Sequence, residues 1–137
     1  MYEMNLREKD FQDLTKYFTG ELYYNDSVEH LAVKKVYATD ASVYQELPLA
    51  VAMPRNTEDI KHLIIFANTN HLALIPRAAG TSLAGQVVGN GLVVDISKHM
   101  TSILEVNKEE KWVRVQPGVI RDDLNACLLY TSDAADE

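Results

Sequence analysis

The stretch Ile75-Pro76-Arg77-Ala78-Ala79-Gly80-Thr81-Ser82-Leu83-Ala84-Gly85-Gln86 carries the strongest structural signal in this chain of 137 residues. It follows a short apolar run, residues 72–75, which predicts a buried strand. Glycine and alanine let main-chain N–H groups converge on an anion, and Thr81 and Ser82 add hydroxyl donors. The pattern therefore predicts a phosphate-binding loop. The alternative is a hairpin loop whose small residues only permit a tight turn.

The spacing of the glycines excludes two common phosphate motifs. Gly80 and Gly85 fit the G-x-x-x-x-G half of a P-loop, but Gln86 and Val87 stand where lysine and serine or threonine would have to follow. A dinucleotide fingerprint is also absent, because residues 89–91 lead directly into the apolar run 92–94, a predicted strand, instead of a helix.

Two helices are predicted in the first half of the chain. The first runs from Leu6 to Phe18, with Asn5 as its cap and Gly20 after its end. Its apolar face, which indicates core packing, consists of Leu6, Phe11, Leu14 and Phe18. The second follows a strand at residues 50–53 and begins at a Thr57 cap. Its apolar stripe consists of Ile60, Leu63, Ile64 and Ala67.

This strand, the second helix and the strand at residues 72–75 predict a parallel, right-handed unit with the loop at the carboxyl end of its second strand, where open α/β sheets bind ligands. Further strands are expected at residues 92–96, 103–106 and 112–115, with a turn at 107–110 and a helix from Val119. Residues 21–41 give no clear pattern.

Several short motifs in a fixed order resemble one family. They are Tyr44, Pro48–Val51, Pro54, Glu58–Ile60, Arg77–Gln86, Gly91–Ser97 and Val115–Val119. This order is similar to the start of the FAD-binding domain of the vanillyl-alcohol-oxidase (PCMH) type, and within it to bacterial FAD-linked D-lactate dehydrogenase and glycolate oxidase flavin subunits. The resemblance runs from about residue 37 to 125. It implies an α/β (α+β) fold, the truncated N-terminal portion of a PCMH-type FAD-binding domain.

The resemblance also implies the cofactor and its ligands. The cofactor-binding residues would be Arg77, Ala78, Ala79, Gly80, Thr81, Ser82, Gly85, Gln86, Pro117 and Gly118. Ala78 departs from the usual glycine, which a negative φ would tolerate. Members that bond flavin covalently through this loop carry histidine where Thr81 stands, so non-covalent FAD is implied. Arg77 would approach the pyrophosphate or pair with an acidic neighbour. Residues 37–44 would form a loop beside the flavin or a polar connector.

The family implies that the intact enzyme oxidises a small 2-hydroxy acid. An electron-acceptor subunit or a fused iron–sulfur domain would lie outside this chain, and no catalytic residue can be named within it. One alternative is another flavin oxidase of the same superfamily, with an alcohol, aldose or alkyl-glycerone substrate. A second is a small non-enzymatic anion-binding module. Asp95, which follows an apolar strand, is interpreted as part of the sheet framework instead of a catalytic carboxylate.

The last residues, Cys127–Glu137, resemble the in-frame translation of a transposase sequencing adapter; the alternative is an ordinary polar tail. The predicted organisation is an N-terminal helical extension at 1–36, a partial FAD-binding domain at 37–126 and a foreign tail at 127–137. Without the three acidic residues of that tail, the formal charge changes from −7 to −4.

Composition narrows the class of partner. The acidic balance argues against nucleic acid, which requires a basic face. The four histidines have no metal-ligand spacing, and the single cysteine falls in the suspected tail, so no metal site is expected. No apolar run approaches the roughly 20 residues of a membrane span, and the N-terminus lacks the apolar core of a signal sequence. A cytoplasmic location is expected, with peripheral membrane attachment of the full-length enzyme as the alternative.

Overall fold

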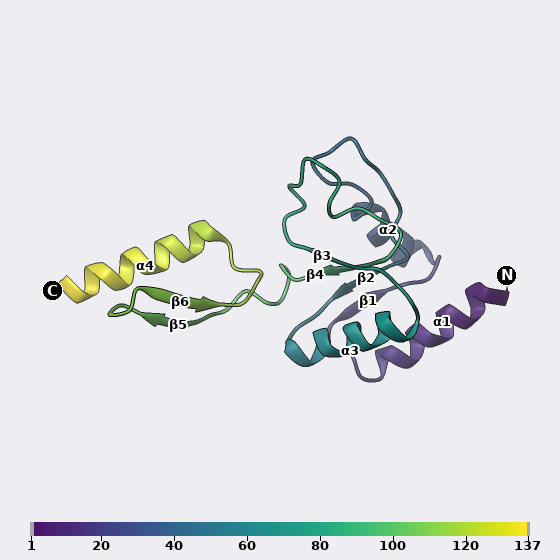
Figure 1. Ribbon diagram of the computed structural model, residues 1–137, viewed down its shortest axis with the longest axis horizontal. Coiled ribbons are helices and arrows are strands. Elements are labelled where there is room, and N and C mark those ends of the chain that lie inside the picture. Colours follow the sequence, from purple (N-terminus) through teal and green to yellow (C-terminus); the bar gives the residue numbers. More distant parts are fainter. Residues whose placement is uncertain (1, 137) are drawn as a thin grey trace.

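The computed structural model describes the backbone of residues 2–136 and the side chains of residues 8–129. A four-stranded sheet lies at its centre (Figure 1). The order is β1 (Glu21–Tyr23), β2 (Ala50–Met53), β4 (Leu92–Asp95) and β3 (Leu74–Arg77). The three strands β2, β4 and β3 are parallel, and β1 pairs antiparallel to β2 at one edge.

Helices cover both faces of this sheet. On one face, α1 (Tyr2–Thr15) and α3 (Thr57–Thr69) pack over a cluster that includes Phe11 and Leu63. On the other face, α2 (Val28–Val36) covers a smaller cluster built on Val51 and Val93. Every residue of β2 and β4 is buried, as expected for strands of a parallel sheet that is covered on both sides.

The structure confirms the first predicted helix and corrects its ends. Phe11, Leu14 and Phe18 are buried on the predicted face. The helix begins before Asn5, which lies inside it and does not cap it; the Leu6 side chain lies outside the described residues. Gly20 does not end α1. A Cβ at Gly20 would stand 2.0 Å from the Met53 carbonyl oxygen, so the chain needs glycine where β1 approaches β2.

The start of α3 also differs from the prediction. Its cap is Asn56, whose side-chain oxygen accepts the Asp59 backbone N–H at 2.8 Å, and Thr57 is the first helical residue. Leu63 and Ala67 are buried as predicted, whereas Ile64 is 54% exposed and Phe66 takes its place in the core. The prediction was wrong there because the buried face, which consists of Asp59, Leu63, Phe66 and Ala67, is rotated around the helix relative to the predicted stripe.

The parallel strand–helix–strand unit is confirmed, with one addition. Strands β2 and β3 are not neighbours, because β4 lies between them and pairs with both. Strand β3 starts two residues later than predicted and includes Arg77, so the glycine-containing loop leaves the end of the strand directly. The unclear region supplies β1 and α2, with Ser27 as the α2 cap, and residues 1–36 thus contribute three elements to this fold.

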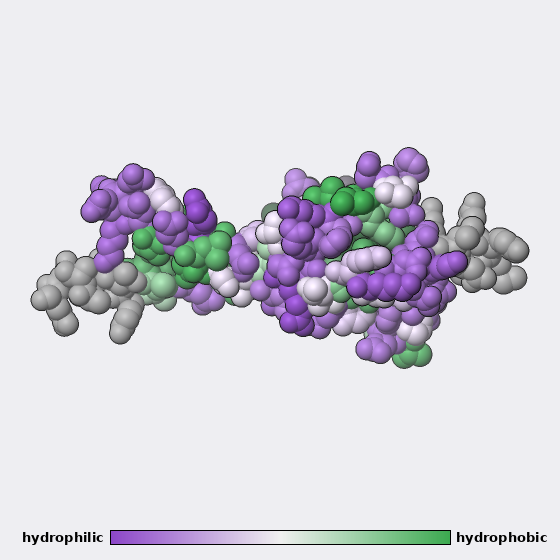
Figure 2. Space-filling model, turned by 90° about the horizontal axis from the view of Figure 1, so that it is seen from below, coloured by the Kyte–Doolittle hydropathy of each residue, from purple (hydrophilic) through white to green (hydrophobic). Residues whose placement is uncertain are grey.

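A separate unit follows the sheet. Strands β5 (Ile103–Asn107) and β6 (Trp112–Val115) form an antiparallel hairpin, and α4 (Arg121–Asp136) lies beside it (Figure 1). The hairpin matches the predicted strands, and Lys111, with φ 59°, completes its turn. Helix α4 begins two residues after Val119 and continues through residues 127–136. Apolar atoms gather on this unit in Figure 2, where it projects from the sheet.

Candidate functional site

The loop after β3 is shaped by two glycines in left-handed conformations. Gly80 has φ 69° and Gly85 has φ 71°, values that other residues adopt only with strain. A Cβ at Gly80 would stand 2.4 Å from Nη2 of Arg77, and one at Gly85 would stand 2.7 Å from the Tyr44 ring. The two glycines therefore let the loop pack closely against two side chains. Gly80 packs on Arg77, which precedes the loop, and Gly85 packs on Tyr44, which belongs to another segment.

Free backbone donors lie in the first half of this loop. Among the described residues, no acceptor takes the backbone N–H groups of Ala79, Gly80 and Thr81. The second half is held internally, because the Ser82 hydroxyl accepts the backbone N–H groups of Ala84 and Gln86, each at 3.3 Å. That hydroxyl also donates to the Gln86 side chain at 3.3 Å. Ser82 thus shapes the second half of the loop, and the N–H groups without an acceptor lie at residues 79–81.

A positive charge stands beside these donors. The Arg77 guanidinium carbon lies 5.1 Å from the centre of the Tyr37 ring, and its Nη1 donates to the Tyr37 carbonyl at 3.4 Å. No carboxylate of the described residues forms an ion pair with Arg77. Of the two roles open from sequence, direct pairing with an acidic neighbour is absent among the described residues, although the Arg77 charge acts on Asp40 at longer range.

A second loop, residues 37–49, lies beside the first (Figure 1). A bridge between Thr39 and Gln45 closes it, and the Asp40 carboxylate accepts the Ser42 backbone N–H at 2.8 Å. Hydrogen bonds from Ser42, with a smaller contribution from the Arg77 charge, lower the pKa of Asp40. A hollow of about 250 Å³ separates the two loops and is lined by Tyr44, Gln45, Glu46, Ala84, Gly85 and Val88.

Pro117 and Gly118 lie at the same edge of the sheet but play a different part. A Cβ at Gly118 would stand 2.3 Å from the Ile96 carbonyl oxygen, and Gly118 donates its N–H to Met100 at 2.8 Å. Ile96 in turn donates its N–H to the Arg77 carbonyl at 3.0 Å. Gly118 therefore packs the segment after the hairpin against Ile96, the residue that follows β4. Through Ile96 it is linked to Arg77, at the start of the loop. Its own N–H is already used, and Pro117 is exposed.

Comparison with known proteins decides the family. A family model described as "FAD binding domain" matches residues 48–131, which is more than half of the chain. The chain belongs to this family of FAD-binding domains. The predicted resemblance is confirmed, FAD is the cofactor, and the matched residues include the small-residue loop after β3.

Two kinds of related enzyme match this chain. D-2-hydroxyglutarate dehydrogenase of Haemophilus influenzae is 43% identical over 75% of this chain, and that of Escherichia coli is 43% identical over 81%. Glycolate oxidase subunit GlcD of Bacillus subtilis is 36% identical over 85%. The chain spans 10% and 11% of the two dehydrogenases and 24% of the oxidase subunit.

Solved structures show the same fold at low identity. An alkyldihydroxyacetonephosphate synthase matches 90% of this chain and 24% of its own, with a TM-score of 0.74 and 17% identity. The 6-hydroxy-D-nicotine oxidase of Arthrobacter nicotinovorans matches 78% of this chain and 23% of its own, with a TM-score of 0.64 and 24% identity. These matches confirm the predicted mixed α/β fold.

The residues of this FAD-binding domain suit a diphosphate. A diphosphate offers several anionic oxygens within a few ångströms, and the loop offers consecutive N–H donors, a left-handed glycine and one unpaired guanidinium. Oriented backbone N–H groups with a nearby arginine are a recurring arrangement for phosphate recognition.

The other candidate residues have local roles. The Asp95 carboxylate accepts the Tyr37 hydroxyl and both the N–H and hydroxyl of Ser97, as a framework residue would. His30 accepts the Tyr24 backbone N–H at 3.0 Å, and His62 stacks on Tyr17. Within the described residues, no group of three or more potential metal ligands comes together. Among the described residues, no helix is long and apolar enough to cross a membrane.

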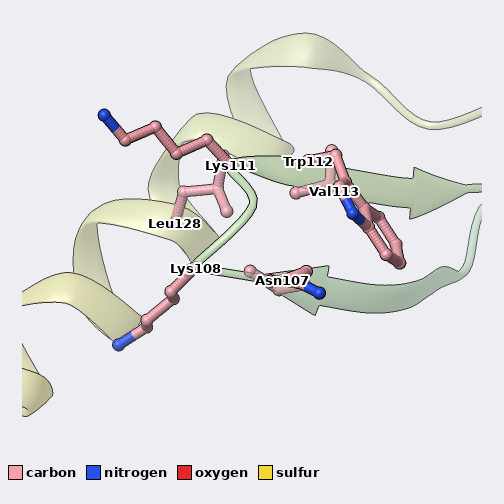
Figure 3. A pocket seen from close by; sticks show the side chains of 7 residues that line it. Asn107, Lys108, Lys111, Trp112, Val113 and Leu128 are labelled. Atoms are coloured by element: carbon pink, nitrogen blue, oxygen red, sulfur yellow. The ribbon is translucent and has the colours of Figure 1, made fainter.

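A larger hollow, of about 450 Å³, lies at the tip of the hairpin, away from the loop after β3. Figure 3 shows Lys108 and Lys111 extending from the hairpin turn near α4, with Leu128 between them and Val113 beside Trp112 on β6. This hollow depends on Leu128, which belongs to the segment interpreted from sequence as foreign, and it takes no part in the cofactor site.

Proposed function

We propose that this chain is the N-terminal part of an FAD-dependent dehydrogenase of a small 2-hydroxy acid, and that its loop after β3 holds the FAD pyrophosphate. The observation that carries the proposal is the run of free N–H groups at residues 79–81 beside the unpaired Arg77. The sequence identity to D-2-hydroxyglutarate dehydrogenases and to a glycolate oxidase subunit supports the substrate class.

The proposed binding residues divide into three groups. Ala79, Gly80 and Thr81 donate backbone N–H groups to the pyrophosphate, and Arg77 adds a positive charge. Ala78, Ser82, Gly85 and Gln86 fix the shape of the loop. Pro117 and Gly118 hold the hairpin against β4 so that the following part of the domain is placed beside the loop. None of these roles requires a side-chain base.

Bound FAD would supply the redox chemistry, as the acceptor of the hydride that the α-carbon of the substrate loses. The residues of this chain hold and orient the cofactor. We place the base that takes the substrate hydroxyl proton, and the clamp for its carboxylate, in a part of the enzyme beyond this chain. The cofactor is held non-covalently at this loop, because Thr81 stands where members that bond flavin covalently through the loop carry histidine.

The proposal extends to the surroundings of the enzyme. The electron acceptor is a partner subunit or a fused iron–sulfur domain, and the enzyme works in the cytoplasm. Residues 127–137 are not native, so the natural sequence diverges from this one near Ala126. The iron content of the full-length protein, and of any protein that co-purifies with it, tests the proposed electron acceptor.

Substrate-dependent bleaching of the flavin tests the proposed activity. The full-length protein, expressed from its source locus, is mixed without oxygen with D-2-hydroxyglutarate, D-lactate or glycolate, and flavin absorbance is followed. We expect one D-2-hydroxy acid or glycolate to bleach the flavin, while L-2-hydroxyglutarate and L-lactate leave it oxidised. A flavoprotein that is reduced only by alcohols or aldoses would contradict the proposed substrate class.

A further inference from the structure

Tyr37 occupies an unusual place between two opposite charges. Its hydroxyl donates to Oδ2 of Asp95, and its ring face carries the Arg77 guanidinium, whose carbon lies 5.1 Å from the ring centre. The tyrosine comes from the end of α2, whereas Arg77 ends β3 and Asp95 ends β4. One side chain thus contacts both charged residues at the carboxyl edge of the sheet.

Without Tyr37, the two charges would be natural partners. Arg77 and Asp95 are paired in the register of β3 and β4, so their side chains leave the sheet on the same face. That face is the one on which Val93 and Ile75 pack in the α2-side cluster. Yet within the described residues Arg77 has no carboxylate within ion-pair distance, although Asp95 is its direct neighbour.

The hydrogen bonds of Asp95 explain this separation. Its Oδ1 accepts the Ser97 backbone N–H at 2.8 Å and the Ser97 hydroxyl at 2.6 Å. Its Oδ2 is taken by Tyr37, so each oxygen of this buried carboxylate has a donor that carries no formal charge. Burial, together with the Asp95 carboxylate, raises the pKa of the Tyr37 hydroxyl, which therefore remains a donor throughout the physiological range.

We propose that Tyr37 is a positioning residue for the cofactor: it satisfies Asp95 through its hydroxyl and supports the Arg77 guanidinium on its ring, and so keeps that guanidinium unneutralised for the FAD pyrophosphate. The inference rests on the proposed function of the loop. It adds a residue forty positions upstream whose own atoms need not touch the cofactor. Losing the hydroxyl would free Oδ2 of Asp95 to capture Arg77.

Two variants separate this role from simple structural support. Tyr37→Phe keeps the ring but frees Asp95, and Tyr37→Phe combined with Asp95→Asn removes the competing charge as well. Each is made in the full-length protein together with Asp95→Asn alone. Tyr17→Phe is the matched control, because Tyr17 is an exposed tyrosine beside His62 on the opposite helical layer. Apoprotein is titrated with FAD, and the dissociation constant is read from flavin fluorescence at several KCl concentrations.

We expect Tyr37→Phe to weaken FAD binding about tenfold. The dissociation constant should also depend less on salt, because an Arg77 charge that Asp95 neutralises no longer contributes an attraction to FAD that salt can screen. The double variant should bind FAD within threefold of Asp95→Asn, and Tyr17→Phe should match the unaltered protein. Equal affinity and equal salt dependence of Tyr37→Phe and the unaltered protein would overturn the inference. So would a loss that Asp95→Asn does not rescue.

If Tyr37→Phe alone does not fold, the double variant is the test. In the double variant residue 95 is asparagine, so no buried carboxylate has lost a hydrogen-bond donor. Affinity equal to that of Asp95→Asn supports the inference, and a further tenfold loss overturns it. Failure of the underlying function is recognised separately: Gly80→Asp would then retain full FAD affinity, whatever Tyr37→Phe does.

Discussion

Gly80→Asp in the full-length protein places a side chain where the loop has no room for one. With φ at 69°, Gly80 lies in the left-handed region, which costs other residues roughly 1–2 kcal/mol. A Cβ there would also stand 2.4 Å from Nη2 of Arg77. Because that atom is the far end of a flexible side chain, the arginine can move aside, and we expect the protein to fold.

The added carboxylate acts on binding far more than on folding. It stands among the donors of residues 79–81 and pairs with Arg77, so a pyrophosphate meets a negative charge in place of a positive one. Loss of two charge-assisted hydrogen bonds costs on the order of 3–6 kcal/mol. A loss of that size weakens FAD binding at least about a hundredfold.

Flavin content after purification reports the effect. The ratio of flavin to protein absorbance should fall close to zero for Gly80→Asp, with folding checked by circular dichroism. Gly80→Ala is the matched control, since it adds the Cβ without the charge: its strain of about 1–2 kcal/mol lowers stability with or without FAD, so it should lose much less flavin than Gly80→Asp. Ala78→Gly should leave flavin content unchanged or raise it. Folded Gly80→Asp protein with full flavin occupancy would refute the placement of the pyrophosphate on this loop.

Three further predictions concern the cofactor, the chain and the fold. The full-length protein should purify yellow and release intact FAD on acid or heat treatment, because Thr81 cannot bond the flavin; flavin that stays with the precipitated protein would disagree. Re-amplification from source DNA should replace Cys127–Glu137 with a different coding sequence, and recovery of the same eleven residues would count against a foreign tail. Asp59 is 1% exposed, and although burial acts to raise its pKa, hydrogen bonds from Thr19 and Arg55 lower the pKa below 3.8. A carboxyl whose pKa is lowered by folding stabilises the folded state above its unfolded pKa and loses that contribution as the pH falls through the folded pKa. Asp59→Ala should therefore cost about 2–4 kcal/mol in unfolding free energy at pH 7 and less at pH 3, as measured by urea titration.

The sheet could be predicted from sequence because its strands are short apolar runs with clear ends. Residues 50–53 and 92–95 are buried along their whole length, and their apolar composition predicts buried strands. The helix ends were less predictable, since Asn56 and Thr57 are adjacent and both suit a cap. Only the structure shows that the Asn56 side chain reaches the Asp59 N–H.

The site was predicted in part, for a related reason. The loop after β3 is contiguous, so its composition predicts an anion site with a plain hairpin loop as the alternative, and the family resemblance favours the first of these. Tyr37 was missed because its two partners, Arg77 and Asp95, lie 40 and 58 positions away. Their adjacency follows from the placement of β4 beside β3, which no local pattern reveals. The resemblance placed residues 37–44 in a loop beside the flavin or in a polar connector, but it did not single out Tyr37.

A crystal structure of the full-length protein with bound FAD tests the central claim most directly. The account predicts pyrophosphate oxygens within about 3.2 Å of backbone nitrogens of Ala79, Gly80 and Thr81, with the Arg77 guanidinium still on the Tyr37 ring. A pyrophosphate bound elsewhere, with residues 79–81 facing solvent, would contradict it.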